Sequence, residues 1–533
     1  MHHDYHKEPP MARILVTDGM ADDGIAQLSE AGHEVVVQSV SAEELPNLIG
    51  NFDGLVVRSA TQVTADVLAA GAPRLRIVGR AGVGVDNIDT AAATAKGVVV
   101  INAPLGNILS AAEHTIGMIF ASHRNIPQAH AKLNAGTWDK KSFIGHEVCG
   151  KTLGIIGLGK IGSHVAKVMQ AAGMNVIAFD PFLSREVAEQ LRVESLPLEE
   201  VLAQSDVITL HVPMTEKTKD MINLTSLKTM KPSARVVNVA RGGIINEDDL
   251  ATALNEGIIA GAALDVFAQE PLAEDSPLRG LPNCVITPHL GASTAEAQVK
   301  VSTDIAAGFN AFFADGTIVN AVNVQLRVDP AIDGYLAVAE KLGSALVQSI
   351  DQPLRGLEVR ARGELAKYDI KPLGVAALKG ALSHICEESV NLINASHIAQ
   401  QRGIDLTTSA SENLKNWSVR LALRATTRDG EHIIGGSLVN GELRIQRFDD
   451  YRIDLPVGGH LLVMEYQDRP GMVGSYGSIL GDANINIARM EVGRIDGRGD
   501  ALVILTLDDP VPAPVLDQLR STIHPQRLFA ISF

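Results

Sequence analysis

Three residues of the sequence, Arg241, Glu270 and His289, are of the types that proton transfer on a small organic acid needs. An imidazole is a suitable general base because its ordinary pKa lies near neutral pH. A carboxylate beside the ring would orient it, and a guanidinium can hold a substrate carboxylate through paired hydrogen bonds. The spacing of the three residues along the sequence does not by itself show that they meet in the folded protein. Each also has a simpler interpretation, as a surface-loop arginine, a turn acid and a loop histidine whose hydrogen bonds are satisfied.

A glycine-rich turn gives these residues a context. Residues 152–156 have the pattern of a buried strand, and the residues after Gly162 have the pattern of a helix that closes at a later glycine. In between, Gly157 and Gly159 would allow a tight turn and close approach of a pyrophosphate, and Gly162 would let helix and strand pack closely. This βαβ pattern is typical of dinucleotide binding, although an ordinary strand–turn–helix with incidental glycines remains the alternative.

An acidic residue, Asp180, ends the next apolar run. It follows the glycines at close to the roughly 20 residues that the motif requires. A carboxylate there binds both ribose hydroxyls and repels a 2′-phosphate, so the sequence predicts NAD rather than NADP. With NAD bound, His289 could take the hydroxyl proton of a 2-hydroxy acid while a hydride leaves for the nicotinamide.

The composition excludes several other classes of protein. The 533 residues contain 62 acids and 46 bases, a net charge of −16, which argues against nucleic acid or an anionic membrane as a partner. No apolar run is long enough to span a membrane, and residues 1–10 lack the apolar core of a signal peptide, so we expect a disordered extension there and a cytoplasmic protein. The three cysteines share no metal-ligand spacing, and no metal site is predicted.

Polar residues also follow the strands expected in the first hundred residues. Arg58 and Ser59 end one strand, the glycine-rich loop 79–84 follows another, and Asn102 ends a third. Strands alternating with helices indicate a parallel α/β sheet, whose ligands bind at the carboxyl ends of the strands. These residues therefore predict a site for an anionic substrate, unless Arg58 is a solvated strand end and the loop a bare turn.

Two expected helices suggest how the domains are connected. A helix over 105–124 would carry the chain into the nucleotide domain, and one long helix over 293–316 would return it. We therefore expect a discontinuous substrate domain with a nucleotide domain inserted into it. The expected divisions are 11–103 with 293–322, then 104–292, 323–458 and 459–533.

Several motifs together resemble the D-isomer-specific 2-hydroxyacid dehydrogenases. They are the glycine turn, Asn-Val-Ala-Arg-Gly-Gly at 238–243, Asp-Val-Phe-Ala-Gln-Glu-Pro at 265–271 and Pro-His-Leu-Gly-Ala at 288–292. Two further stretches, Val-Arg-Ser-Ala-Thr at 57–61 and Gly-Arg-Ala-Gly-Val-Gly-Val-Asp-Asn at 79–87, narrow the resemblance to members that act on D-3-phosphoglycerate. The similarity extends from Ala12 to Phe533.

The resemblance implies an NAD-dependent oxidation of D-3-phosphoglycerate to 3-phosphohydroxypyruvate, which opens L-serine synthesis, by a homodimer or homotetramer. The family often has threonine where this chain has Val83 and Val212, so contacts there would come from the backbone. The implied roles are: acid/base, His289 with its partner Glu270; substrate anchor, Arg241; pyrophosphate turn, Lys160 and Ile161; adenosine ribose, Asp180; nicotinamide side, Val212, Ala240 and Asp265; substrate contacts, Arg58, Ser59, Val83, Asn102 and Lys141.

Residues 323–458 carry no catalytic pattern and resemble the α+β intervening domain of the long form of these enzymes. Helices are expected over 337–349 and 379–401, and strands over 354–361 and 442–448. Lys371, Arg424 and Arg444 could serve an anion there, or could simply be solvated.

The last residues have the βαββαβ order of an ACT domain, with Arg-Pro-Gly at 469–471 in the first turn. In related enzymes L-serine binds between paired ACT domains, at positions that correspond to Tyr466, Asp468 and Asn486. A dimerisation module without a ligand is the alternative for this domain. For the whole chain, the alternatives are a glyoxylate or hydroxypyruvate reductase and a non-enzymatic NAD-sensing regulator on the same fold.

Overall fold

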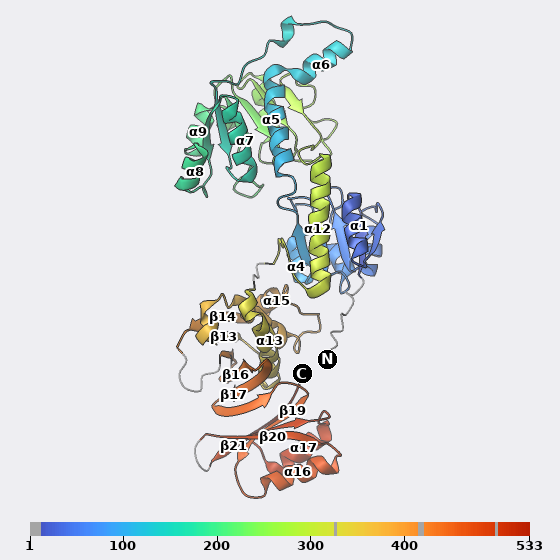
Figure 1. Ribbon diagram of the computed structural model, residues 1–533, viewed down its shortest axis with the longest axis vertical. Coiled ribbons are helices and arrows are strands. Elements are labelled where there is room, and N and C mark those ends of the chain that lie inside the picture. Colours follow the sequence, from blue (N-terminus) through green and yellow to red (C-terminus); the bar gives the residue numbers. More distant parts are fainter. Residues whose placement is uncertain (1–11, 325–327, 414–419, 496–498) are drawn as a thin grey trace, which may run out of the picture.

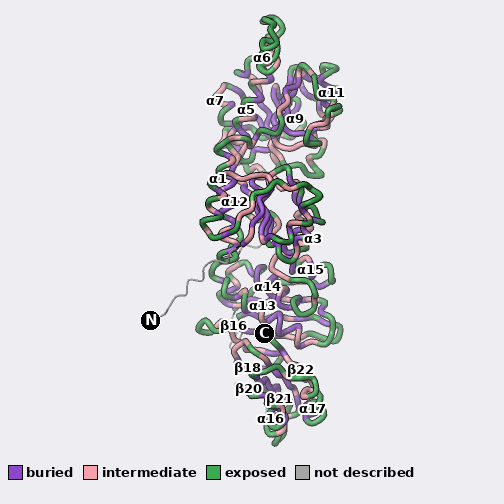
Figure 2. The backbone as a smooth tube through the Cα atoms, turned by 90° about the vertical axis from the view of Figure 1, so that its right-hand side faces the viewer, coloured by how far each residue is buried: buried purple, intermediate pink, exposed green. Residues whose placement is uncertain are grey.

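The computed structural model describes residues 12–324, 328–413, 420–495 and 499–533. The expected extension at 1–10 lies outside these residues. Figure 1 shows an elongated molecule in which the second parallel sheet, the first parallel sheet, the intervening region and the C-terminal region follow one another along the long axis. Buried segments run through the interior of each region (Figure 2). The predicted fold class is confirmed: mixed α/β with two parallel sheets, followed by two further domains.

The first sheet is parallel, in the order β2-β1-β3-β4-β5. Apart from the edge strand β2, its strands are short and largely buried, as expected for strands covered on both faces. Helices pack on both sides, and α12 returns from far along the chain to place Ile305 and Phe309 against the sheet. The bounds are β1 Arg13–Val16, α1 Asp22–Glu30, β2 Glu34–Val37, α2 Leu45–Leu48, β3 Gly54–Val57, α3 Ala65–Gly71, β4 Ile77–Arg80, α4 Thr90–Ala95 and β5 Val99–Asn102.

The second sheet is also parallel, in the order β12-β11-β10-β9-β6-β7-β8. Its chain order reverses beside β6, so the carboxyl ends of β6 and β9 flank the crevice where such sheets bind nucleotides. The bounds are β6 Thr152–Ile156, α7 Lys160–Ala171, β7 Asn175–Phe179, α8 Arg185–Leu191, β8 Glu194–Ser195, α9 Leu198–Gln204, β9 Val207–Leu210, α10 Leu224–Leu227, β10 Arg235–Asn238, α11 Glu247–Asn255, β11 Gly261–Leu264 and β12 Cys284–Ile286.

Two helices connect the two sheets. The first, α5 (Ile108–Arg124), carries the chain out of the first sheet, and α6 (Ile126–Asn134) follows it. The second is α12 (Ala295–Asp315). Thr294 caps its N-terminus, where the hydroxyl accepts the Ala297 N–H, and Gly316, with φ of 80°, caps its C-terminus. Ser110 and Thr294 share a hydrogen bond of 2.8 Å, so the two connections meet near the boundary between the sheets.

The intervening region has a six-stranded sheet in the order β14-β13-β15-β16-β17-β18 with helices against one face. The single helix expected over 379–401 is wrong. The structure has α14, which ends at Leu382, and α15, which begins at Ala395. In between, Asn391 and Asn394 bind nearby backbone groups, which competes with helical hydrogen bonds. The bounds are α13 Asp333–Gln348, β13 Gly356–Arg362, α14 Lys371–Leu382, α15 Ala395–Gln401, β14 Asp405–Ser411, β15 Leu421–Thr426, β16 Glu431–Val439, β17 Glu442–Phe448 and β18 Tyr451–Pro456.

The C-terminal sheet is antiparallel, in the order β20-β21-β19-β22, and its strands β19, β21 and β22 have apolar residues buried against the intervening region, whereas the edge strand β20 is largely exposed. Along β19, Leu462 and Met464 face the helices α16 and α17, whereas Leu461 and Val463 belong to the core of the intervening region. A hydrogen bond of 2.8 Å from the Tyr451 hydroxyl to Glu465 also joins the two regions. The bounds are β19 His460–Gln467, α16 Met472–Asp482, β20 Ile487–Arg494, β21 Asp500–Leu507, α17 Ala513–Ile523 and β22 Arg527–Ser532.

Candidate active site

The glycine turn after β6 is shaped by close backbone approach. Gly157 has φ of 95°, and a Cβ there would lie 2.5 Å from the carbonyl oxygen of His211. A Cβ on Gly162 would lie 2.3 Å from the carbonyl oxygen of Gly157. At Gly159, by contrast, a Cβ would meet nothing within 4 Å, so the space beside the first turn of α7 is open. A side chain at this position would fill the space that a dinucleotide pyrophosphate needs, and the turn therefore fits NAD.

Asp180 lies at the carboxyl end of β7, beside this turn. Its Oδ2 accepts the Leu158 N–H at 2.9 Å, and its Oδ1 accepts the Phe182 N–H at 2.9 Å. The backbone therefore fixes the carboxylate next to the glycine turn, where an adenosine ribose would lie.

A cavity of about 260 Å³ lies between the two sheets, next to the nucleotide turn. It brings together residues that the sequence places far apart: Ile161, Val212, Ala240 and Arg241 from the second domain, Val83 from the first, and His289. His211 contributes to the same wall, and burial lowers its pKa to about 4, which keeps this ring neutral at physiological pH.

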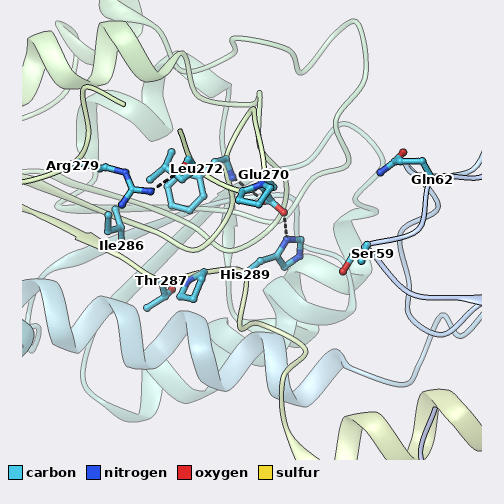
Figure 3. A pocket seen from close by; sticks show the side chains of 12 residues that line it. Ser59, Gln62, Glu270, Leu272, Arg279, Ile286, Thr287 and His289 are labelled. Atoms are coloured by element: carbon cyan, nitrogen blue, oxygen red, sulfur yellow. Dashed lines mark hydrogen bonds and ion pairs between the residues drawn. The ribbon is translucent and has the colours of Figure 1, made fainter. Parts of the chain in front are cut away.

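His289 and Glu270 form a short hydrogen bond of 2.6 Å between Nδ1 and Oε2 (Figure 3). Burial raises the pKa of Glu270. Hydrogen bonds from His289 and the Phe267 N–H lower it by more, so the pKa of Glu270 lies below its ordinary value. The carboxylate therefore stays ionised beside the ring. His289 has φ of 55°, a left-handed conformation that is uncommon for residues other than glycine.

A second cavity, of about 710 Å³, lies on the Glu270 side of the pair. Its walls include Phe267, Leu272 and Ile286 from the second domain and Ser59 and Gln62 from the first. Figure 3 shows Ser59 and Gln62 on the opposite side of the cavity from Glu270. His289 lines both cavities, so it lies between the smaller cavity next to the glycine turn and the larger cavity, which has room for a substrate.

The first domain contributes positive charge to the same cleft. Arg80, at the end of β4, repeats the arrangement of Arg58, which follows β3, but the sequence predicts no substrate contact for it. Burial, with the neighbouring charges of Arg241 and Arg58, lowers the pKa of Arg80 to about 10. Its buried Nε has no hydrogen-bond partner within the described part of the chain. The three neighbouring guanidinium groups, one with an unused donor, could hold an anion, although the charges of Asp86 and Asp18 also act on Arg80.

Arg241 reaches across the cleft from the second domain to the first. Its Nε donates to Asp86 at 2.9 Å, and its Nη1 donates to the carbonyl oxygen of Ala240 at 2.6 Å. A Cβ on Gly84 would lie 2.0 Å from Arg241 Nη2, so the glycine loop makes room for this guanidinium.

The remaining predicted substrate residues lie in different places. Asn102 Nδ2 donates to the carbonyl oxygen of Val83 at 2.5 Å and so holds the glycine loop. Ser59 lines the larger cavity. Lys141, in contrast, is exposed in a short 3₁₀ turn (Lys141–Phe143) beyond α6 and lines neither cavity.

Asp265 is fully buried just after β11, and its carboxylate accepts hydrogen bonds from the loop that carries His289. Oδ1 accepts the Leu290 N–H at 2.8 Å and the Thr287 hydroxyl at 2.5 Å, and Oδ2 accepts the Gly291 N–H at 2.8 Å. Asp265 therefore fixes the backbone immediately after His289, a role that the sequence motif did not suggest.

The three predicted effector residues do not meet within one chain. Tyr466 is buried against Tyr476, and Asp468, just after β19, pairs with Arg494 at the end of β20. Asn486, just before β20, donates to Asp508 at 2.8 Å. Because β19 and β20 both run antiparallel to β21, they run in the same direction, and Asp468 and Asn486 lie at opposite ends of the sheet.

Three family models match the chain. They are D-isomer specific 2-hydroxyacid dehydrogenase, NAD binding domain, at residues 116–291; D-3-phosphoglycerate dehydrogenase intervening domain, at 331–448; and ACT domain, at 460–524. The D-3-phosphoglycerate dehydrogenase of Synechocystis sp. is 44% identical over 96% of this chain and 92% of its own length. The chain belongs to the D-3-phosphoglycerate dehydrogenase family. The enzymes of that name from Methanocaldococcus jannaschii and Bacillus subtilis are 42% and 39% identical, each over 96% of this chain and 98% of the relative.

Solved structures resemble the two parallel-sheet domains of this D-3-phosphoglycerate dehydrogenase family member. A putative D-3-phosphoglycerate dehydrogenase from Ralstonia solanacearum is 32% identical, with a TM-score of 0.52 over 58% of this chain and 97% of its own. An NAD-dependent formate dehydrogenase from Staphylococcus aureus, in complex with NAD, is 27% identical, with a TM-score of 0.54 over 58% and 99%. The chain is thus an NAD-dependent oxidoreductase with an ACT domain. Among the described residues, no helix is long and apolar enough to cross a membrane.

Proposed function

We propose that this chain oxidises D-3-phosphoglycerate to 3-phosphohydroxypyruvate with NAD, the first step of L-serine synthesis. The observation that carries the proposal is the hydrogen bond of 2.6 Å between His289 and Glu270, placed between the nucleotide-side cavity and the larger cavity. A family membership covering nearly the whole chain supports the choice of substrate.

His289 is the proposed acid/base. Its Nδ1 is bound to Glu270, which leaves Nε2 to accept the proton of the substrate hydroxyl. The ionised Glu270 stabilises the imidazolium that forms and keeps the ring in one orientation. When bound, NAD accepts the hydride from the substrate carbon that carries this hydroxyl.

The proposed cofactor site comprises the nucleotide turn and the smaller cavity. The turn would hold the pyrophosphate, Asp180 the adenosine ribose, and the cavity the nicotinamide. The residues assigned to NAD are Gly157, Gly159, Lys160, Ile161, Gly162, Asp180, Val212 and Ala240, with Asp265 acting through the loop that follows His289.

The proposed substrate site depends on the arginine cluster. Arg241 would anchor the substrate carboxylate or carbonyl oxygen, and Arg58 and Arg80 would take the phosphate. Ser59, Asn102 and the backbone at Val83 would complete the site. Lys141 is exposed outside both cavities, so a role in substrate binding would require the cleft of a second copy.

Regulation by L-serine is part of the proposal. Because Asp468 and Asn486 lie at opposite ends of one sheet, a small amino acid can meet both only between two copies. We accordingly propose a homo-oligomer with an effector site shared between ACT domains. The proposed domains are the substrate domain (11–103 with 293–322), the NAD domain (104–292), the intervening domain (323–458) and the ACT domain (459–533).

The first experiment is NADH formation with D-3-phosphoglycerate at alkaline pH with product removal, followed by the same assay with millimolar L-serine. Turnover supports the proposal, and loss of turnover with serine supports the effector site. If D-3-phosphoglycerate gives no turnover and the protein instead reduces glyoxylate or hydroxypyruvate with NADH, the protein is a reductase of that kind. If it binds NAD but turns over none of these compounds, the result supports a non-enzymatic NAD-sensing regulator.

A further inference from the structure

His114 lies on α5, the helix by which the chain leaves the first domain and enters the second. Its Nε2 is 3.2 Å from Asp265 Oδ1 and 3.2 Å from the Thr287 hydroxyl. Thr287 is itself 2.5 Å from the same carboxylate oxygen. The three side chains form a compact polar cluster beneath the loop that carries His289.

A buried carboxylate is costly unless donors surround it. Asp265 is fully buried, and its described donors are two backbone N–H groups of the His289 loop, the Thr287 hydroxyl and His114. Burial raises the pKa of Asp265, and hydrogen bonds, led by that from His114, outweigh burial and lower it overall. Of these four donors, only His114 comes from outside the segment 287–291.

The loop needs such support because of its backbone. His289 has φ of 55°, and the strain of a left-handed residue persists only where neighbouring contacts fix it. Its N–H donates to the Asp265 carbonyl at 2.8 Å, and the two N–H groups that follow donate to the Asp265 carboxylate. The position of that carboxylate therefore sets the direction of the His289 ring.

The location of His114 adds a connection to the domain boundary. Ser110, one helical turn earlier on α5, bonds to Thr294 at the start of α12, at 2.8 Å. Both connections between the domains therefore meet within a turn of the residue that contacts Asp265. A change in the angle of α5 would move the His114 ring relative to the carboxylate.

We propose that His114 is a positioning residue that joins the interdomain helix α5 to Asp265 and thereby fixes the His289 loop in its catalytic orientation. His114 lines neither of the two cavities described above. That this orientation serves catalysis rests on the proposed role of His289.

The test compares His114→Leu, which removes the donor at similar size, with His114→Gln, which can return an N–H donor to the Nε2 position. The first readout needs no substrate: hydrogen exchange of the Leu290 and Gly291 amides in the full-length protein. We expect exchange at least about tenfold faster in His114→Leu and close to wild type in His114→Gln. The second readout is kcat, expected to fall about 10- to 100-fold in His114→Leu with little change in substrate KM, since a misplaced base slows chemistry more than binding.

His123 supplies a matched control. It is a buried histidine on the same helix, and its Nδ1 contacts the backbone carbonyl of Ile119 at 2.9 Å rather than Asp265. His123→Leu should leave exchange at 290–291 unchanged even if it lowers the melting temperature. Unchanged exchange and kcat in His114→Leu would overturn the proposal. Equal losses in the Leu and Gln variants would overturn it too, because packing would then explain them. If the wild type does not oxidise D-3-phosphoglycerate, the exchange measurement still decides the inference separately.

Discussion

The two parallel sheets have similar architectures and opposite chemical character at their carboxyl ends. The first sheet ends in cations, with Arg58 after β3 and Arg80 on β4. The second presents backbone N–H groups at the start of α7, the carboxylate of Asp180 and the His289 loop. One sheet is suited to an anionic substrate, the other to a dinucleotide and a base. The shared fold therefore determines where a ligand binds, and the residues at the strand ends determine which ligand binds there.

The two domains also differ in how far each site depends on the other. The nucleotide turn is complete within the second domain, whereas the proposed anion site needs Arg241 from across the cleft. Changes in the second domain should therefore separate cofactor binding from chemistry, and changes in the first should act mainly on substrate binding.

The largest expected effect is at the base. His289→Ala should lower kcat about 10³-fold, within the range typical of a lost general base. NAD affinity, measured by quenching of protein fluorescence, should stay close to wild type because the glycine turn and Asp180 are untouched. Unchanged turnover would remove His289 from the mechanism and weaken the contrast between the sheets.

A smaller effect is expected from Arg80→Ala in the first sheet. Loss of a charged hydrogen bond worth about 1.5–3 kcal/mol should raise the KM for D-3-phosphoglycerate about 10- to 100-fold, with NAD binding unaltered. Arg74→Ala is the control, because Arg74 pairs with Asp53 at the surface, 3.3 Å away, and is not part of the arginine cluster. Equal KM values for the two variants would contradict an anion site at Arg80.

Asp180→Ala tests the second sheet without touching the first. We expect NAD to bind about tenfold more weakly and NADP to improve relative to NAD, because the carboxylate no longer binds the ribose hydroxyls or repels a 2′-phosphate. Titration of both cofactors checks this. The KM for D-3-phosphoglycerate at saturating NAD should not change, and a large change there would show that the two halves of the site are not separable.

The smallest effect on basal turnover is expected at Asn486. Asn486→Ala should leave uninhibited activity within about twofold, because Asn486 lines neither cavity and surface substitutions usually change stability by little. It should blunt any inhibition by L-serine. A serine dose–response curve on both proteins measures this. If serine inhibits the variant as it does the wild type, the effector site lies elsewhere.

The sequence predicts a site residue best where the local backbone conformation requires that residue type. The glycine turn, Asp180 and the polar ends of neighbouring strands follow from short-range backbone geometry. Arg80 ends its strand in the same pattern as Arg58, but the pattern alone does not show that its guanidinium lies beside Arg241. His114 belongs to no recognisable motif, because its proposed role depends on a carboxylate that follows β11, about 150 residues further along the chain. Likewise, the separation of Asp468 from Asn486 follows from strand order, which no local pattern encodes.

The C-terminal sheet has apolar side chains on both faces, one under its own helices and the other under the intervening region. An isolated module of this kind would expose Leu461, Val463 and Ile504 to water, and such a flat apolar surface promotes aggregation. The ACT and intervening domains are therefore poor candidates for exchange one at a time between enzymes. A chimera that gains or loses regulation should carry both as a single cassette.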